Sequence, residues 1–163
     1  TVGGGARPRG DRLDRLAAAV VSYAGGRADA LGGGRTLAGC RILPRDRGAR
    51  LAICRELAAV APPVPVAPGA AVRWDGRFRV TLSRDARMPP GATIGAAGSG
   101  ARARPGVPIA VLRTLPALST PDGALVSAEI DTRQAPAASV SMRSACVVFA
   151  PDVPLAAAAF GIV

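Results

Sequence analysis

The chain has no histidine, no lysine and only three cysteines, Cys40, Cys54 and Cys146. Without histidine, the sequence excludes a histidine general base, a Ser-His or Cys-His nucleophile and a zinc centre within these residues. An odd number of cysteines without metal-type spacing is neither a disulfide framework nor a metal site. The sequence shows no charged-then-apolar leader and no apolar run near the roughly 18 residues of a membrane span. We therefore expect a cytoplasmic chain without membrane contact.

Aromatic residues are scarce, at 3% of the 163 residues, although 49% of the chain is hydrophobic. Much of that hydrophobic fraction is alanine. A core of Val, Leu, Ile and Ala buries less area per residue, at about 25 cal/mol per Å². We expect modest stability, or support from a neighbouring domain.

Positive charge is abundant and unevenly distributed. All 21 basic residues are arginine, and the net charge is +10. Residues 1–87 hold 16 arginines and 7 acidic residues, whereas residues 88–163 hold 5 and 4. The preference for arginine over lysine fits either phosphate recognition or the codon bias of a GC-rich genome. The excess charge itself indicates a polyanionic partner, with a generic solvated basic surface as the alternative.

The patterns predict an α+β chain with three segments. Residues 1–30 are expected to form a linker and an N-terminal helix, 31–87 a basic β-hairpin domain that binds substrate, and 88–163 a smaller mixed α/β portion. The Gly- and Pro-rich opening lacks a start methionine and resembles a cut inside a longer protein. The helix should begin at Asp11 and stop at Gly25-Gly26. Its predicted apolar stripe consists of Leu13, Leu16, Ala17, Val20 and Ala24.

Two arginine-rich hairpins are predicted in the basic half. The first pairs Thr36–Leu43 with Ala49–Arg55 and sets Cys40 opposite Cys54, as two buried thiols rather than a bridge. Arginine at the alternate positions predicts a sheet with one buried face and one cationic face. The proline-rich spacer Ala58–Gly69 should then run extended over the surface.

The second hairpin surrounds Trp74. A three-residue loop, Trp74 to Gly76, sets Val72 opposite Phe78 and keeps the apolar face whole, which a two-residue Asp75-Gly76 turn would not do. Trp74 could stack on a nucleotide base at the tip of this loop, but a tryptophan folded into the core is the favoured interpretation.

The second half is predicted from weaker signals. Its expected elements are a strand at Thr93-Ile94, a short helix over Pro108–Leu115, a turn at Pro121–Gly123, and strands over Ala124–Ile130 and Ser141–Phe149, with a loose segment between the last two.

No catalytic motif emerges from the sequence. The run Gly32 to Arg35 lacks the spacing of a phosphate loop and a preceding strand. Acidic residues are scattered beside arginines, as in Asp11 and Arg12, which indicates surface charge balance. We therefore predict no catalytic residue and no metal ligand in this chain.

Several stretches together resemble bacterial tRNA(Ile)-lysidine synthetases of the alphaproteobacterial type, in the region after their catalytic domain. These stretches are Pro8–Leu16, Arg35–Ile42, Leu51–Glu56, Trp74–Phe78, Leu115–Leu118 and Val148–Leu155. The resemblance covers most of the chain, and its specificity lies in their order and spacing.

The resemblance implies an enzyme that uses ATP, with magnesium, to adenylate the wobble cytidine of an isoleucine tRNA and then attaches lysine. In that family the chemistry belongs to an N-terminal domain with an S-G-G-x-D-S loop. That loop does not occur here, so no active-site residue can be carried over. The resemblance implies that this chain holds tRNA for the catalytic domain, and its expected partners are tRNA and that domain.

The candidate RNA contacts lie on the predicted basic face and at its hairpin tip, and RNA helices are bound mainly through shape and backbone. They are Arg35, Arg41, Arg45, Arg47, Arg50, Arg55, Arg73, Trp74, Arg77 and Arg79. The alternative is a scaffold whose basic sheet docks on an acidic protein face without contacting RNA. A homodimer through bare strand edges is a further open alternative.

Overall fold

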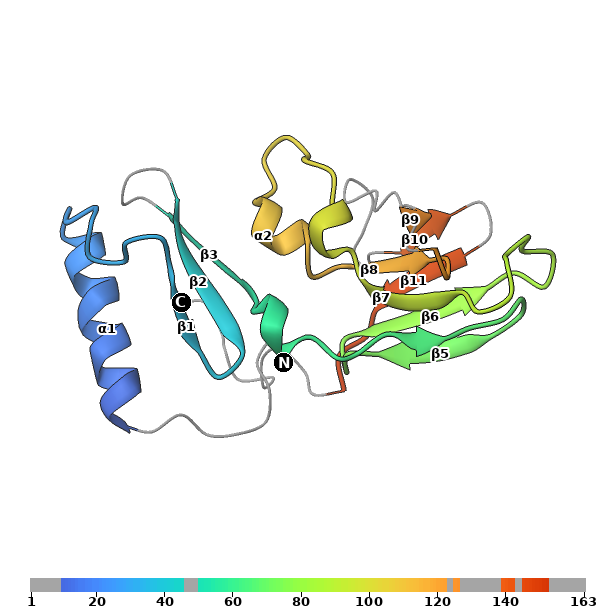
Figure 1. Cartoon of the computed structure of the whole chain (residues 1–163). Coiled ribbons are helices and arrows are strands. Elements are labelled where there is room, and N and C mark those ends of the chain that lie inside the picture. Colours follow the sequence, from blue (N-terminus) through green and yellow to red (C-terminus); the bar gives the residue numbers. More distant parts are fainter. Residues whose placement is uncertain (1–9, 46–49, 123–124, 127–138, 143–144, 153–163) are drawn as a thin grey trace. The chain divides into compact units, whose positions relative to one another are not determined.

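The structure is a computed structural model that describes residues 10–45, 50–122, 125–126, 139–142 and 145–152 (Figure 1). The chain divides into two compact units. The unit that we call the α1 unit comprises Val2–Val60 and Ala103–Thr114. The two-sheet unit comprises Ala61–Arg102 and Leu115–Val163, with Thr1. These divisions do not coincide with the predicted segments 1–30, 31–87 and 88–163. The predicted α+β class is confirmed.

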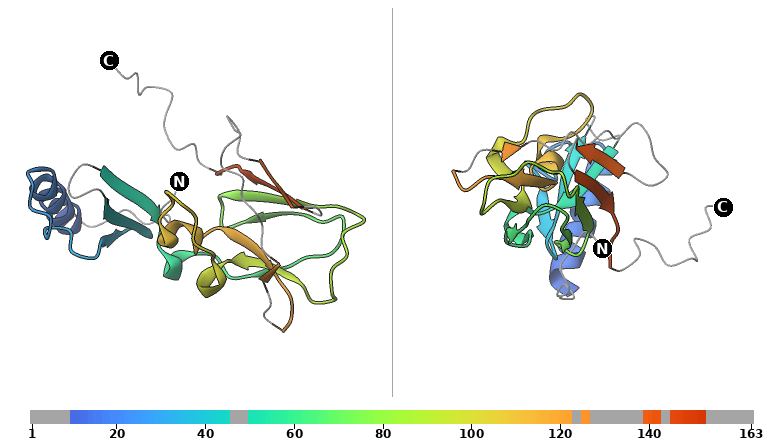
Figure 2. Two further views of the ribbon diagram at one scale, coloured as in Figure 1. Left: turned by 90° about the horizontal axis from the view of Figure 1, so that it is seen from above. Right: turned by 90° about the vertical axis from the view of Figure 1, so that its right-hand side faces the viewer.

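The α1 unit combines a long helix with a small antiparallel sheet of order β1-β2-β3. In Figure 1 and in the left view of Figure 2 the sheet lies between α1 and α2. Its elements are α1 (Gly10–Ala24), β1 (Arg35–Leu37), β2 (Cys40–Arg45), β3 (Arg50–Arg55), the 3-10 turn η2 (Leu57–Ala59) and α2 (Ile109–Leu112).

Helix α1 ends where the glycines predict, and Gly26 has a φ of 93°, a conformation that glycine adopts readily. Its inward stripe differs from the predicted one. The partly or fully buried residues of its second half are Leu16, Ala19, Val20, Ser22 and Tyr23, and all but Ser22 follow the spacing i, i+3, i+4 and i+7. Leu13 is instead 49% exposed. The buried stripe includes Tyr23, whose hydroxyl donates to the carbonyl oxygen of Arg45 at 2.6 Å.

The predicted strand Thr36–Leu43 is interrupted by a tight turn. Leu37 pairs with Cys40, so the loop between them holds only Ala38 and Gly39, with φ values of 50° and 74°. Positive φ at both positions is the conformation that favours two-residue hairpins. The first hairpin is therefore a three-stranded meander, and the prediction of a single strand here was wrong because alanine gives no turn signal.

The predicted pairing of Cys40 with Cys54 is also wrong, by one residue. Cys40 pairs with Arg55, and Cys54 pairs with Arg41. A shift of one residue moves each side chain relative to its partner on the opposite strand. As a result, arginine does not occupy a single face of the sheet.

Strand pairing assigns the arginines to both faces of this sheet. Arg41, Leu43 and Arg45 alternate along one face of β2. Arg35 is paired with Ile42 and lies on the opposite face. The predicted division into one apolar and one cationic face is thus corrected to two mixed faces.

The two-sheet unit contains two four-stranded antiparallel sheets, which appear as separate layers in Figure 2. One has the order β10-β11-β6-β5 and the other β4-β7-β8-β9. The strands are β4 (Val64–Pro65), β5 (Ala71–Trp74), β6 (Phe78–Leu82), β7 (Thr93–Ala96), β8 (Pro116–Ser119), β9 (Leu125–Val126), β10 (Ser139–Met142) and β11 (Ala145–Phe149), with a 3-10 turn η3 (Gly98–Gly100).

The scarce aromatic residues gather in the core of this unit. Strand β6 alternates buried and exposed residues along its length, as expected for a half-buried strand. The rings of Trp74 and Phe78 stack with centroids 6.2 Å apart, and Phe149 meets Phe78 edge-on at 5.6 Å. Ile94 from the other sheet is 1% exposed. Both sheets therefore contribute to the buried interior.

The hairpin between β5 and β6 has a three-residue loop, but not the predicted one. Trp74 pairs with Phe78 and Val72 with Val80, so the loop is Asp75 to Arg77. Asp75 and Gly76 have φ values of 54° and 61°. The apolar face stays whole, and Trp74 belongs to the strand instead of the loop.

The predictions for the second half are mixed. A strand at Thr93-Ile94 is confirmed by β7, and the predicted helix is confirmed as the shorter α2. The prediction of one strand over Ser141–Phe149 was wrong, because β10 and β11 form a hairpin. Strand β8 was missed, and of Ala124–Ile130 only β9 is described. Proline-containing β4 lies at a sheet edge, where a missing backbone donor is tolerated.

Candidate nucleic-acid interface

The positive charge of the chain is concentrated in the α1 unit. By sequence, this unit holds 13 arginines and 5 acidic residues, a net of +8. The two-sheet unit holds 8 arginines and 6 acidic residues, a net of +2. A polyanion is therefore attracted mainly to the α1 unit.

A pocket of about 390 Å³ opens within the α1 unit. Its lining combines four arginines with apolar side chains and includes no acidic residue: Arg41, Leu43, Pro44, Arg45, Arg55, Leu57, Pro108, Ile109, Ala110 and Arg113. The volume falls within the range of about 300 to 1,000 Å³ that small-molecule sites occupy. The lining of the pocket is therefore strongly cationic.

The floor of the pocket comes from strand β2 and its walls from two short elements. Arg41, Leu43 and Arg45 line it because they share one face of the strand. Leu57 comes from η2, and α2, which contacts β3, contributes Ile109 and Ala110.

Two of the pocket arginines are held by backbone carbonyls. An Nη of Arg41 donates to the oxygen of Gly33 at 3.2 Å, and an Nη of Arg55 donates to the oxygen of Ala59. Such bonds use one of the five N–H donors of each guanidinium and orient its plane. Both side chains are therefore partly preorganised for an anion.

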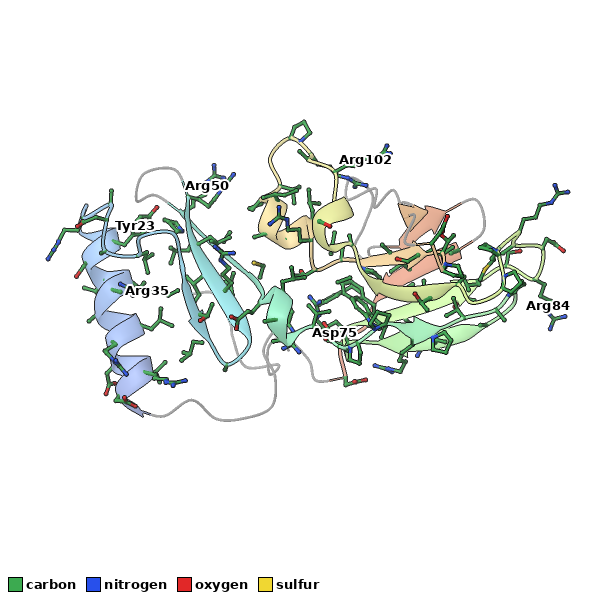
Figure 3. The ribbon with its side chains drawn as sticks, in the orientation of Figure 1. Tyr23, Arg35, Arg50, Asp75, Arg84 and Arg102 are labelled. Carbon is green, nitrogen blue, oxygen red and sulfur yellow. The ribbon has the colours of Figure 1, made fainter. Side chains whose placement is uncertain are left out.

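The hairpin end near the pocket is tied to α1 through Tyr23, which is 2% exposed (Figure 3). Its hydroxyl lies 2.6 Å from the carbonyl oxygen of Arg45 and 3.5 Å from that of Arg50. These contacts hold the ends of β2 and β3 against the helix, and with them the backbone that carries Arg45.

The other predicted contacts of the α1 unit lie outside the pocket. Arg50 is exposed at the start of β3 (Figure 3), and Arg35 is exposed with an Nη donating to the oxygen of Ala30 at 3.3 Å. Arg47 lies outside the described residues. Both Arg35 and Arg50 are thus exposed to solvent.

Two predicted contacts of the two-sheet unit are buried. Trp74 is 1% exposed, and its Nε1 donates to the oxygen of Pro62 at 3.1 Å. Arg77 is 5% exposed, with its Nε and an Nη each 2.6 Å from Oδ2 of Asp75. The Arg77 guanidinium also lies 4.9 Å from the centroid of the Phe78 ring. Both side chains are thus engaged in packing, which is the favoured alternative for Trp74.

Asp75 holds this hairpin against the beginning of the two-sheet unit. Its Oδ1 accepts the backbone N–H of Ala61 at 2.8 Å, and its Oδ2 pairs with Arg77. Together with the Trp74 bond to Pro62, this contact secures the first residues of the spacer to the sheet.

The remaining predicted contacts, Arg73 and Arg79, are exposed and paired across β5 and β6. Arg73 forms an ion pair with Asp152 and donates to the oxygen of Ala150 at 2.9 Å. Arg73 and Arg79 belong to the two-sheet unit, whereas the pocket residues belong to the α1 unit.

Sequence reasoning missed Arg113, Ile109 and Leu57 as site residues. Arg113 lies at the end of the helix predicted over Pro108–Leu115, in the half of the chain that carries little net charge. The only available signal was an arginine directly after an apolar helical turn, a common pattern that points to no particular site.

Within the described part of the chain, no helix is long and apolar enough to cross a membrane. The same residues contain no cluster of three His, Cys, Asp or Glu side chains that could hold a metal ion. Comparison with protein-family models, curated proteins and solved structures finds no match to this chain.

Proposed function

We propose that this chain binds RNA through the α1 unit, as the tRNA-holding accessory region of a tRNA(Ile)-lysidine synthetase. The observation that carries the proposal is the net charge of +8 on this unit, with four arginines around one pocket. The order of the stretches that resemble the family supports tRNA as the polyanion. The resemblance assigns ATP use and lysine transfer to the catalytic domain, and the role of this chain is to position the isoleucine tRNA.

The structure reduces the set of proposed RNA contacts. The proposed contacts in the α1 unit are the exposed arginines of its sheet and of the residue after α2, which can reach a phosphate backbone without opening a core. They are Arg35, Arg41, Arg45, Arg50 and Arg113, with half-buried Arg55. We do not propose Trp74 and Arg77 as RNA contacts, because contact with RNA would require the aromatic core to open.

A salt titration of tRNA binding tests the proposal. Each phosphate contact releases counterions, so log K should fall linearly with log salt concentration, by about 0.7 to 0.9 for each phosphate. Arg50→Gln should reduce this slope by about one contact. Arg84→Gln removes the same charge from an exposed site of the two-sheet unit (Figure 3) and should leave the slope unchanged. A slope near zero for the unmodified chain would refute RNA binding.

A second candidate function, docking on another protein domain, is favoured by one observation. Among the described residues, the large hydrophobic side chains that are exposed all belong to the α1 unit: Leu13, Val21, Leu51, Ile53, Leu57 and Ile109. Val21 and Ile53 are 71% and 62% exposed. A scaffold of this kind would bind an acidic protein face, for example on the family's catalytic domain, and would not bind tRNA. A pull-down with that domain and a tRNA titration on the same sample separate the two functions.

A further inference from the structure

The pocket of the α1 unit combines two kinds of surface that a single phosphate ion cannot satisfy. Four guanidinium groups supply positive charge, and the lining includes no carboxylate. The large apolar side chains of Leu57 and Ile109 line the same pocket, yet they are 46% and 41% exposed. A ligand that fits must carry an anionic group and also a flat apolar face that covers these side chains.

A nucleotide has this combination of properties. Its phosphate accepts hydrogen bonds from the planar guanidinium fork, which matches phosphate oxygens in a bidentate manner. Its base presents a broad face that packs on apolar side chains or on arginine planes. An aromatic stacking platform is absent from the pocket lining, so leucine, isoleucine and arginine would take that role.

The size of the pocket selects an unstacked nucleotide over a duplex. A volume of about 390 Å³ admits one small ligand and not a double helix. Single-stranded loops and ends of RNA expose bases that can leave the stack, and proteins recognise RNA sequence mostly in such regions.

We infer that this pocket binds one unpaired nucleotide of an RNA strand, with its phosphate at the guanidinium groups and its base against Leu57 and Ile109. The inference rests on the proposed RNA-binding function and deepens it, because the pocket adds a local site to an otherwise diffuse electrostatic surface. Arg45 and Arg113 are the phosphate ligands best tested, since both line the pocket and both are exposed.

Binding of small probes to the whole chain tests the pocket directly. Calorimetric titration with cytidine 5′-monophosphate should show one site, with cytidine and inorganic phosphate each at least about tenfold weaker. Arg113→Gln should weaken monophosphate binding roughly 10- to 100-fold, as expected when a hydrogen bond to a charged group is lost. The matched control is Arg84→Gln, an exposed arginine of the two-sheet unit outside the pocket lining, which should leave binding unchanged. Equal affinity for phosphate and the nucleotide would overturn the inference.

A variant of the apolar wall separates a nucleotide site from a simple anion site. Leu57→Ala should weaken nucleotide binding about three- to tenfold and leave phosphate binding unchanged, because it removes only apolar contact. Ile109→Ala repeats the test on the opposite wall if the first variant fails to fold. Unchanged nucleotide binding in a folded variant of either residue would show that the base does not occupy this wall.

Competition experiments distinguish RNA from free nucleotides. A single-stranded tetranucleotide should displace the monophosphate, whereas an RNA duplex should not. Failure of the tetranucleotide would assign the pocket to free nucleotides and overturn the RNA inference. Steep salt dependence of tRNA binding without any monophosphate binding would overturn the pocket alone and leave the proposed function standing.

Discussion

Replacing Asp75 with asparagine removes the negative charge that faces the buried guanidinium of Arg77. The two side chains are 1% and 6% exposed, and both Arg77 contacts to Oδ2 of Asp75 are 2.6 Å long. Asparagine also accepts the left-handed φ of 54° at this position well, so the change isolates charge from backbone strain.

The expected cost follows from burial. Leaving one member of a buried ion pair without its partner costs about 3 to 5 kcal/mol. Asparagine keeps one oxygen for the N–H of Ala61 but turns an amide N–H toward the guanidinium. With a urea slope of roughly 1 to 3 kcal/mol per molar, the unfolding midpoint should fall by about 2 M.

Fluorescence provides the assay because Trp74 is the only tryptophan and is 1% exposed in the same core. The matched control is Asp152→Asn, which removes the partner of Arg73 from a pair whose side chains are 47% and 58% exposed. Exposed pairs contribute about 0 to 1 kcal/mol. If the two variants lower the midpoint equally, the stabilising role assigned to the buried pair is refuted.

Two further predictions concern the α1 unit. Gly34→Ala should destabilise this unit by about 1 to 3 kcal/mol, because φ is 113° and the new Cβ would lie 2.8 Å from Cδ2 of Leu43. The control Gly33→Ala places its Cβ with nothing within 4 Å and should be nearly neutral. Thermal unfolding followed by circular dichroism compares the two variants. Tyr23→Phe should cost about 1 kcal/mol, because the carbonyl of Arg45 loses its buried donor, and hydrogen exchange should accelerate in β2 and β3 but not in β6. Equal exchange in all three strands would contradict the assigned contact.

Local signals predicted the elements that depend on local chemistry. The glycines after Ala24 end α1, and proline before Ile109 begins α2. The alternation in β6 fixes its buried face without reference to its partners. These features depend on backbone preferences and periodicity, both of which are visible in sequence.

Strand register was predicted wrongly where the residues in the turns carry no clear turn signal. Ala38 and Asp75 adopt positive φ, which is uncommon for residues other than glycine, so the turn at Ala38 was not predicted and the loop at Asp75 was predicted one residue too early. The loop error placed Trp74 at a loop tip. A separate shift of one residue in the pairing of β2 with β3 set Cys40 opposite Cys54.

The candidate pocket could not be predicted for a different reason. Its lining joins β2 to Arg113, which is distant in the chain, and no local pattern encodes that contact. The division of the charge between residues 1–87 and 88–163 also splits the α1 unit, since it assigns Arg104 and Arg113 to the weakly charged half. Only the fold shows that they belong to the basic unit.

The α1 unit is built from two stretches of chain that are separated in sequence by part of the other unit, so the ribosome makes them at different times. Helix α2 belongs to the α1 unit, but the ribosome makes it only after Ala61–Arg102, which contains β4 to β7 of the other unit. A nascent chain that has reached Val60 contains the residues of the helix and of the arginine-bearing sheet but not α2 and Arg113. The basic surface is therefore available before the pocket, and a truncation at Val60 should retain salt-dependent attraction to RNA while losing selectivity for a nucleotide.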